Sequence, residues 1–310
     1  MTVLAIDVGG TKLAAALVSA SGELSRRTRR PTGTDPWASL VALLDEVTAG
    51  VAVEGAGIGC GGPIRWPQGE VSPLNMPAWR GFPLAARLAD RYPGVPVRLH
   101  NDAVCVAVGE HWRGGWDTGD LLGMVVSTGV GGGLVLDGRL ADGPTGNAGH
   151  VGHLVVEPAG PACGCGGRGC LEAVARGPAV VAWAAERGCA ARDGSELAAL
   201  ARGGDAVAQR AFSRAGWALG IGIASAAALL DVRVVAVGGG FAEAGAVLWT
   251  PLREALAVHA RLGYLDGLRV EPAALGQDAG LYGAAALVLA GDRYWRGRSS
   301  SDAGARDSPV

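Results

Sequence analysis

Apolar runs of strand length alternate along the chain with stretches of helical length. The short runs are rich in Val, Leu, Ile and Ala and predict β-strands at residues 3–6, 12–19, 56–58, 122–126 and 232–237. The longer stretches predict helices at residues 37–47, 83–91, 103–112, 177–187, 205–230, 251–260 and 280–290. Because strands and helices alternate, we predict an α/β fold.

The length of the chain favours two lobes. A chain of 310 residues is long for one hydrophobic core, and 49% apolar residues allow two cores to be buried. We expect a small α/β lobe at residues 1–98, with a C-terminal helix at about 279–292 packing back on it, and a large α/β lobe at 99–278. Residues 296–310 are poor in apolar side chains, so we expect a disordered tail there.

Charge and hydropathy argue against some functions. A net charge of −2 gives no sign of a nucleic-acid or anionic-membrane partner. The first residues lack a basic region and reach Asp7 too early for a signal peptide. The longest apolar run, 217–230, is too short to cross a bilayer. We therefore expect a cytoplasmic protein.

Two loops with glycine and a hydroxyl side chain follow predicted strands and are candidates for phosphate binding. Their candidate residues are Asp7, Gly9, Gly10, Thr11 and Lys12 in the first loop and Thr128, Gly129, Gly131, Gly132 and Gly133 in the second. The chain contains no G-x-x-x-x-G-K-[ST] sequence, so it is not a P-loop enzyme.

Loops of this kind offer backbone N–H groups and a hydroxyl to phosphate oxygens. Asp7, at the end of a strand, suits a Mg²⁺ ion held through water, and Lys12 suits phosphate. One such loop alone would more simply be a hairpin turn. Two of them, with an aspartate before the first, favour a nucleotide.

Four candidate metal ligands lie within 18 residues: His153, Cys163, Cys165 and Cys170. One histidine and three cysteines form a closed tetrahedral zinc set, which leaves no position for a reacting water, so we expect a structural zinc. The alternative, four unrelated buried residues, is a poor explanation for three cysteines in a glycine-rich loop. We expect Cys60, Cys105 and Cys189 to be small core residues.

These motifs resemble those of ROK-family sugar kinases, which belong to the actin-like ATPase superfamily. Residues 4–12 resemble the first phosphate motif of the family, 127–133 the second, and 235–240 the loop near adenosine, which includes Gly239 and Gly240. The zinc motif is similar too, and the likeness covers the chain except its tail. It implies a two-lobed actin-like (ribonuclease-H-like) fold with the active site in a cleft between the lobes. It also implies ATP and Mg²⁺ as cofactors, a small sugar as substrate, and a homodimer or homotetramer.

Asp102 follows Asn101 at the start of a predicted helix, where the helix dipole favours an ionised carboxylate. A residue at this place is more commonly an N-cap. ROK kinases carry the same Asn-Asp pair, and the resemblance implies that Asp102 is the general base and that Asn101 binds sugar hydroxyls. The sugar-binding residues that we expect besides these two are Gly61, Gly62, Asn75, His150, His153 and Glu172.

His150 bears on the choice of sugar. Many ROK glucokinases have A-G-E-x-G-H before the zinc ligands, whereas residues 148–153 of this chain are Ala-Gly-His-Val-Gly-His. A carboxylate only accepts hydrogen bonds, whereas a neutral imidazole donates one and accepts one. The A-G-H-x-G-H form is similar to that of bacterial N-acetylmannosamine kinases in the family, as are residues 4–17 and 160–166.

This likeness implies phosphorylation of the 6-hydroxyl of N-acetyl-D-mannosamine, with Gly61 and Gly62 leaving room for the acetamido group. Glucokinase activity is the alternative. A sugar-responsive ROK regulator without kinase activity is a third possibility, but such regulators carry an N-terminal helix-turn-helix, for which the residues before Asp7 leave no room.

Overall fold

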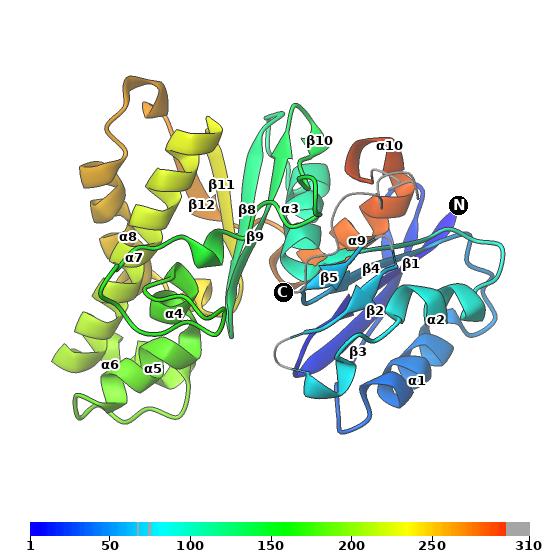
Figure 1. Ribbon diagram of the computed structural model, residues 1–310, viewed down its shortest axis with the longest axis horizontal. Coiled ribbons are helices and arrows are strands. Elements are labelled where there is room, and N and C mark those ends of the chain that lie inside the picture. The colour runs from blue at the N-terminus through cyan, green and yellow to red at the C-terminus, as the bar shows by residue number, and fades with distance from the viewer. Residues whose placement is uncertain (67, 74–75, 296–310) are drawn as a thin grey trace. The chain divides into compact units, whose positions relative to one another are not determined.

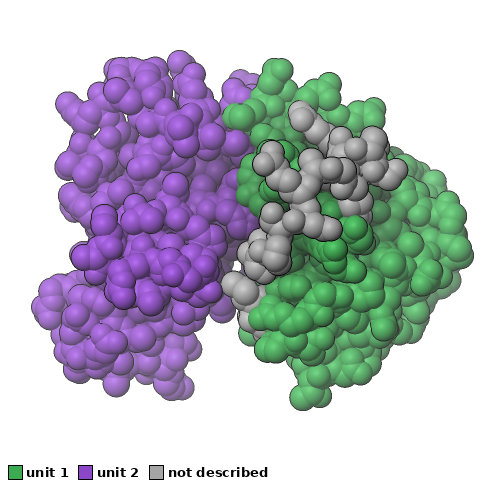
Figure 2. All heavy atoms as spheres, in the orientation of Figure 1, with its two compact units in different colours: residues 1–116, 135–148, 278–310 green, residues 117–134, 149–277 purple. Residues whose placement is uncertain are grey.

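The computed structural model describes residues 1–66, 68–73 and 76–295, so Asn75 and the predicted disordered tail lie outside the described residues. The chain divides into two compact units, which Figure 2 colours separately. Of the described residues, unit 1 comprises those within 1–116, 135–148 and 278–295, and unit 2 comprises 117–134 and 149–277.

Unit 1 is built on a five-stranded sheet with the order β3-β2-β1-β4-β7. Its first three strands are antiparallel, and β1, β4 and β7 are parallel to one another. The strands are β1 (Thr2–Val8), β2 (Lys12–Ser19), β3 (Leu24–Pro31), β4 (Ala56–Cys60) and β7 (Val97–Asn101). A separate two-stranded ribbon pairs β5 (Ile64–Arg65) with β6 (Glu70–Val71).

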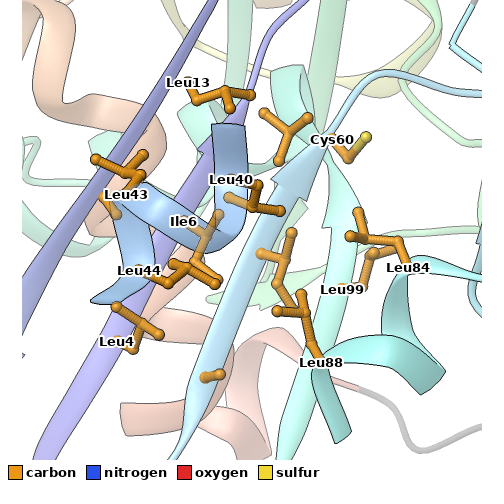
Figure 3. Close-up of a cluster of buried hydrophobic side chains, with 14 of the residues drawn as sticks. Leu4, Ile6, Leu13, Leu40, Leu43, Leu44, Cys60, Leu84, Leu88 and Leu99 are labelled. Carbon is orange, nitrogen blue, oxygen red and sulfur yellow. The ribbon is translucent and has the colours of Figure 1, made fainter. Parts of the chain in front are cut away.

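Alternating side chains of this sheet enter two hydrophobic clusters, one on each face. Leu4 and Ile6 of β1 pack with α1 (Pro36–Thr48) and α2 (Leu84–Arg91), and Figure 3 shows Leu40, Leu43 and Leu44 of α1 beside them. Each fully buried leucine of this kind contributes about 1.5–3 kcal/mol through burial.

The intervening residues Val3 and Ala5 point to the opposite face. They pack with α3 (Asp102–Arg113) and α9 (Ala279–Leu289), and α10 (Gly291–Tyr294) follows α9. Because α3 lies against α9, it belongs to unit 1, and the first unit continues to Trp116 instead of ending near residue 98. A 3₁₀ turn, η1 (Pro77–Trp79), completes the elements of this unit.

The second five-stranded sheet has the order β10-β9-β8-β11-β12, with β8, β11 and β12 parallel. Its strands are β8 (Leu121–Val126), β9 (Val130–Leu136), β10 (Arg139–Leu140), β11 (Val234–Gly238) and β12 (Arg269–Pro272) (Figure 1). The end of β9 and the whole of β10 belong to unit 1. All the strands predicted from apolar runs are present in the two sheets.

The helices of unit 2 surround α7 (Ala206–Leu230), which contacts four others. These are α4 (Leu171–Ala175), α5 (Gly177–Ala185), α6 (Gly194–Arg202) and α8 (Ala246–His259). Asp205 caps α7 by accepting hydrogen bonds from Val207 N and Ala208 N, at 2.9 and 2.8 Å. Four 3₁₀ turns are η2 (Val151–His153), η3 (Ala242–Ala244), η4 (Gly263–Leu265) and η5 (Gly276–Asp278).

By length and composition, α7 is the one helix in the described part of the chain that could cross a membrane. The helix agrees with the predicted range 205–230 to within one residue and contains the apolar run 217–230. More than half of its most apolar window is buried within the protein. Together with its contacts to four other helices, this burial identifies α7 as the core helix of unit 2.

Candidate functional site

The first predicted phosphate loop is a tight hairpin turn between β1 and β2. Gly9 N donates to Lys12 O at 3.0 Å, which closes the turn and leaves Thr11 and Lys12 exposed. The buried Thr32 fixes the loop from the side, because its hydroxyl donates to Gly9 O at 2.7 Å and its N–H donates to Thr11 O at 3.1 Å. Thr32 is a residue that the sequence analysis missed, and no motif marks it.

The predicted base and its neighbours gather at one edge of the sheet in unit 1. In the parallel register, Val8 is level with Cys60 and Cys60 with Asn101, so the carboxyl ends of β1, β4 and β7 meet there. This edge is where open α/β sheets bind ligands. It brings together Asp7, Gly61, Gly62, Asn101 and Asp102. A Cβ added to Gly61 would lie 4.0 Å from Asp102 Oδ2, and one added to Gly62 would lie 3.4 Å from Asn101 Nδ2.

Asn101 and Asp102 are both held by the start of α3. The backbone N–H of Ala103 donates to Asn101 Oδ1 at 3.0 Å and to Asp102 Oδ1 at 2.9 Å. The buried His100 also positions Asn101, because its Nδ1 accepts from Asn101 N at 2.8 Å. His100 was not among the predicted site residues, although it directly precedes the Asn-Asp pair.

The carboxylates of Asp7 and Asp102 both lie at this edge, and nearby positive charges offset their negative charge only in part. Burial, and after it the charge of Asp102, raises the pKa of Asp7 to about 7, against the opposing charges of Lys12 and Arg29. Because burial and mutual repulsion disfavour the charged carboxylates, a bound cation would stabilise them. Unit 1 therefore fits a hydrated Mg²⁺ near Asp7.

The second predicted loop lies in unit 2 between β8 and β9. Ser127 N donates to Gly129 O at 2.9 Å, and Gly177 N, at the start of α5, donates to Ser127 O at 2.8 Å. The loop is shorter than predicted, because Gly131, Gly132 and Gly133 belong to β9. Only Thr128 and Gly129 of the five predicted residues lie in the turn itself.

A cavity of about 680 Å³ opens beside this loop, within unit 2. Ser127 and Thr128 line it on one side, and Gly240 and Phe241, from the loop after β11, line another. Phe241 N donates to Val126 O at 3.1 Å, which ties the two loops together. The volume of the cavity is in the range of small-molecule sites. Its walls are mostly apolar and carry a few polar groups, which is the kind of lining that a nucleoside requires.

Charged residues complete the wall of the cavity, namely Arg192, Asp193, Arg202 and Glu243. The sequence analysis did not find them, because they come from α6, the residues before it and η3, which no motif connects. Gly239 adjoins this wall through its neighbour Gly240.

The four predicted zinc ligands converge in unit 2. One ligand atom from each of His153, Cys163, Cys165 and Cys170 lies within 4.8 Å of all the others. Two of the separations, Cys165 Sγ to Cys170 Sγ and Cys163 Sγ to His153 Nδ1, are 3.8 Å. A tetrahedral zinc ion with Zn–S bonds of about 2.3 Å requires sulfur atoms about 3.8 Å apart. The residues therefore fit a structural zinc ion.

The remaining predicted sugar contacts adjoin this cluster. His153 turns Nδ1 toward the cysteines, which leaves Nε2 on the other side of its ring. The ring of the exposed His150 is nearly parallel to that of His153, with centroids 6.3 Å apart. Glu172 is the second residue of α4, which begins directly after Cys170, and its Oε2 accepts from Val130 N at 3.0 Å. Cys60, Cys105 and Cys189 are buried, as predicted.

The sequence matches the model of the ROK family over residues 3–290. It is 38% identical over 298 residues to the N-acetylmannosamine kinase of Shigella boydii, and the match covers 93% of this chain and 98% of that protein. The crystal structure of the ROK hexokinase from Thermus thermophilus superposes with a TM-score of 0.80 at 38% identity, covering 92% of this chain and 97% of that one.

A third similar protein is a ROK family glucokinase from Streptomyces griseus, crystallised in complex with glucose and AMPPNP. Its structure has a TM-score of 0.80 at 31% identity, and the match covers 93% of this chain and 99% of that one. With the two α/β units described above, these matches confirm the predicted two-lobed actin-like ATPase fold.

Proposed function

This chain belongs to the ROK family and is an ATP-dependent sugar kinase, and we propose that it phosphorylates the 6-hydroxyl of N-acetyl-D-mannosamine. The observation that carries the choice of sugar is the 38% identity to the Shigella N-acetylmannosamine kinase over nearly the full length of both chains. The histidine at position 150 supports it, because an imidazole can donate as well as accept a hydrogen bond.

Asp102 is the proposed general base. It lies at the N-terminus of α3, where the helix dipole and the N–H of Ala103 favour its charged form. An ionised carboxylate would accept the proton of the 6-hydroxyl as that oxygen attacks the γ-phosphorus of ATP, while the bond from this phosphorus to the β–γ bridging oxygen breaks and ADP leaves. Asn101, held by the same N–H, would orient the sugar through its side-chain amide.

Each unit carries groups that we propose bind nucleotide: a phosphate loop in unit 1, and in unit 2 a phosphate loop with the adjoining cavity. Thr11 and Lys12 in unit 1 and Thr128 and Gly129 in unit 2 would contact phosphate oxygens. The cavity beside Thr128 and Gly240 would hold the adenosine. Mg²⁺, when bound, neutralises phosphate charge, and Asp7 would hold its water ligands.

The zinc site is proposed to organise sugar binding. A zinc ion bound by Nδ1 of His153 determines which ring nitrogen faces the sugar and holds the ring in one orientation. It also fixes Cys170, and therefore the start of α4, which carries Glu172. We propose that His150, His153 and Glu172 bind sugar hydroxyls or the acetamido group, with Gly61 and Gly62 leaving room for the latter.

Glucokinase activity is the second candidate. It is favoured by the similarity to the Streptomyces protein, which is 31% identical and was crystallised with glucose, and to the Thermus ROK hexokinase, which at 38% is as similar to this chain as the Shigella kinase. A cytoplasmic location and a homodimeric or homotetrameric state are also part of the proposal, and size-exclusion chromatography with light scattering measures the latter.

A coupled assay of ATP consumption distinguishes the two sugars. The panel should contain N-acetylmannosamine, N-acetylglucosamine, glucose and mannose, with phosphorus NMR of the product to locate the phosphate. We expect the highest kcat/KM for N-acetylmannosamine and a 6-phosphate product. A higher kcat/KM for glucose would replace this proposal with glucokinase.

A further inference from the structure

Glu172 contacts the second phosphate loop. Its Oε2 accepts a hydrogen bond of 3.0 Å from the backbone N–H of Val130, the residue that follows Gly129. The contact leaves no room for a side chain at position 129, because a Cβ added to Gly129 would lie only 2.9 Å from the same Oε2. A carboxylate predicted to bind sugar therefore occupies the space beside a residue predicted to bind phosphate.

Val130 is also held from its carbonyl side. A Cβ added to Gly152 would lie 2.0 Å from Val130 O, so the segment that carries His150 and His153 packs directly against the backbone of Val130. Any larger residue at position 152 would displace either its own segment or the backbone at Val130. Val130 is thus enclosed between Gly152 and Glu172.

Both neighbours of Val130 lie within two residues of a predicted zinc ligand. Gly152 precedes His153, and Glu172 lies two residues after Cys170. The two segments are joined to each other, because Leu171 N donates to Leu154 O at 2.8 Å and Val155 forms a bridge with Cys170. A short path of bonded contacts therefore runs from the zinc cluster to the phosphate loop, entirely within unit 2.

We propose that Glu172 is a positioning residue for the nucleotide. Its carboxylate orders the second phosphate loop through Val130, so that nucleotide affinity depends on the zinc loop. The proposal rests on the proposed function in taking this loop as part of the ATP site. It differs from a sugar-binding role, since the effect appears with nucleotide alone.

Electrostatics and positioning predict opposite results for this residue. A carboxylate near phosphates repels them, so its removal would strengthen nucleotide binding if charge were its main effect. If the hydrogen bond to Val130 orders the loop, removal leaves the N–H without its partner and weakens binding. Two variants separate the effects. Glu172→Gln retains an accepting oxygen without the charge, and Glu172→Met has similar length but only a weak thioether acceptor in place of the carboxylate oxygens.

The experiment measures the dissociation constant of Mg²⁺–AMPPNP by calorimetry, without sugar, on the full-length protein. We expect Glu172→Gln to bind within about threefold of the unchanged protein and Glu172→Met to bind at least about tenfold more weakly. Glu186→Met removes an exposed glutamate of the same unit and is the matched control, with unchanged affinity expected. Zinc content and thermal midpoint, measured on each variant, report whether the fold is retained.

A second variant approaches the same contact from the loop. Gly129→Ala places a methyl group against Glu172 Oε2 and should weaken AMPPNP binding while the zinc content stays at that of the unchanged protein. Equal affinities for Glu172→Met and the unchanged protein, or tighter binding by Glu172→Met, would overturn the inference. If the unchanged protein itself fails to bind AMPPNP, the proposed function fails instead.

Discussion

The charge of Asp102 raises the pKa of Asp7, in addition to the larger effect of burial. Asp7 is the next-to-last residue of β1 and Asp102 is the first residue of α3, and the parallel register of β1, β4 and β7 places both at one edge of the sheet. The protein accepts two carboxylates there at a cost to its own stability. We interpret this cost as the consequence of a site built to act on a substrate with a bound cation.

Asp102→Asn tests the base. The amide is almost isosteric and can still accept from Ala103 N, so the fold should persist, but it cannot take up the proton of a sugar hydroxyl. We expect kcat to fall by about 10²–10⁴-fold. The coupled assay measures the loss, with the exposed Asp90→Asn as a control that should keep full activity. Near-normal kcat in Asp102→Asn would remove this residue from the mechanism.

Asp7→Asn should change how stability depends on pH. In the folded protein the pKa of Asp7 is about 7, against 3.8 as its ordinary value, so the folded state binds a proton that the unfolded state releases between these pH values. The free energy of unfolding therefore falls as pH rises from about 4 to 7, by up to about 4 kcal/mol from this residue. Asp7→Asn has no carboxyl group at this position, so its free energy of unfolding should not fall with pH for this reason.

Urea denaturation without nucleotide or Mg²⁺, at pH 5 and at pH 8.5, measures the effect. Relative to the unchanged protein, Asp7→Asn should gain stability at pH 8.5 and gain much less at pH 5. The same variant should lose most of its kinase activity, because Asp7 no longer holds the hydrated cation. A stability difference that is equal at both pH values would contradict the pKa assignment.

Zinc should be present at one ion per chain in protein purified without added metal. Elemental analysis of Cys165→Ser should show that the ion is lost, since three remaining ligands bind zinc much more weakly. Sugar affinity should fall with it. Cys189→Ala, which changes a buried cysteine outside the cluster, should keep its zinc. Folded, active protein with no zinc would show that the cluster is not a metal site.

His150→Glu tests the choice of sugar. A carboxylate accepts from two neighbouring hydroxyls, whereas an acetamido sugar replaces one of these with a larger group to which an imidazole can donate. We expect the ratio of kcat/KM for N-acetylmannosamine over glucose to fall by about 5- to 150-fold, without loss of catalysis. An unchanged ratio would mean that another residue selects the sugar.

The local sequence was sufficient to predict a feature where the residues that form it are close together along the chain. The zinc set could be predicted from spacing because its four ligands lie in one glycine-rich segment, and the structure brings them within 4.8 Å. The α/β class followed from the alternation of apolar runs, and the family from the residues around the two loops. In each of these cases the signal consists of short stretches of adjacent residues, each of which forms one strand, helix, loop or ligand set.

The second loop shows where a local pattern misled. Glycines after a strand predict a turn, but Gly132 lies within β9, and a Cβ there would lie 2.9 Å from the side chain of Val151. Its role is to let another segment approach the strand closely. The sequence does not distinguish a glycine that turns the chain from one that makes room for a neighbour distant in sequence.

The sequence by itself determined the chemistry of this protein: the ligand types, the Asn-Asp pair and the family to which they belong. Only the tertiary structure decided which of these groups act on each other. The raised pKa of Asp7 depends on strand register, the contact between Glu172 and Val130 depends on how α4 packs, and the cavity wall combines segments with no shared motif. Such couplings arise from packing between distant segments, which no pattern of adjacent residues encodes.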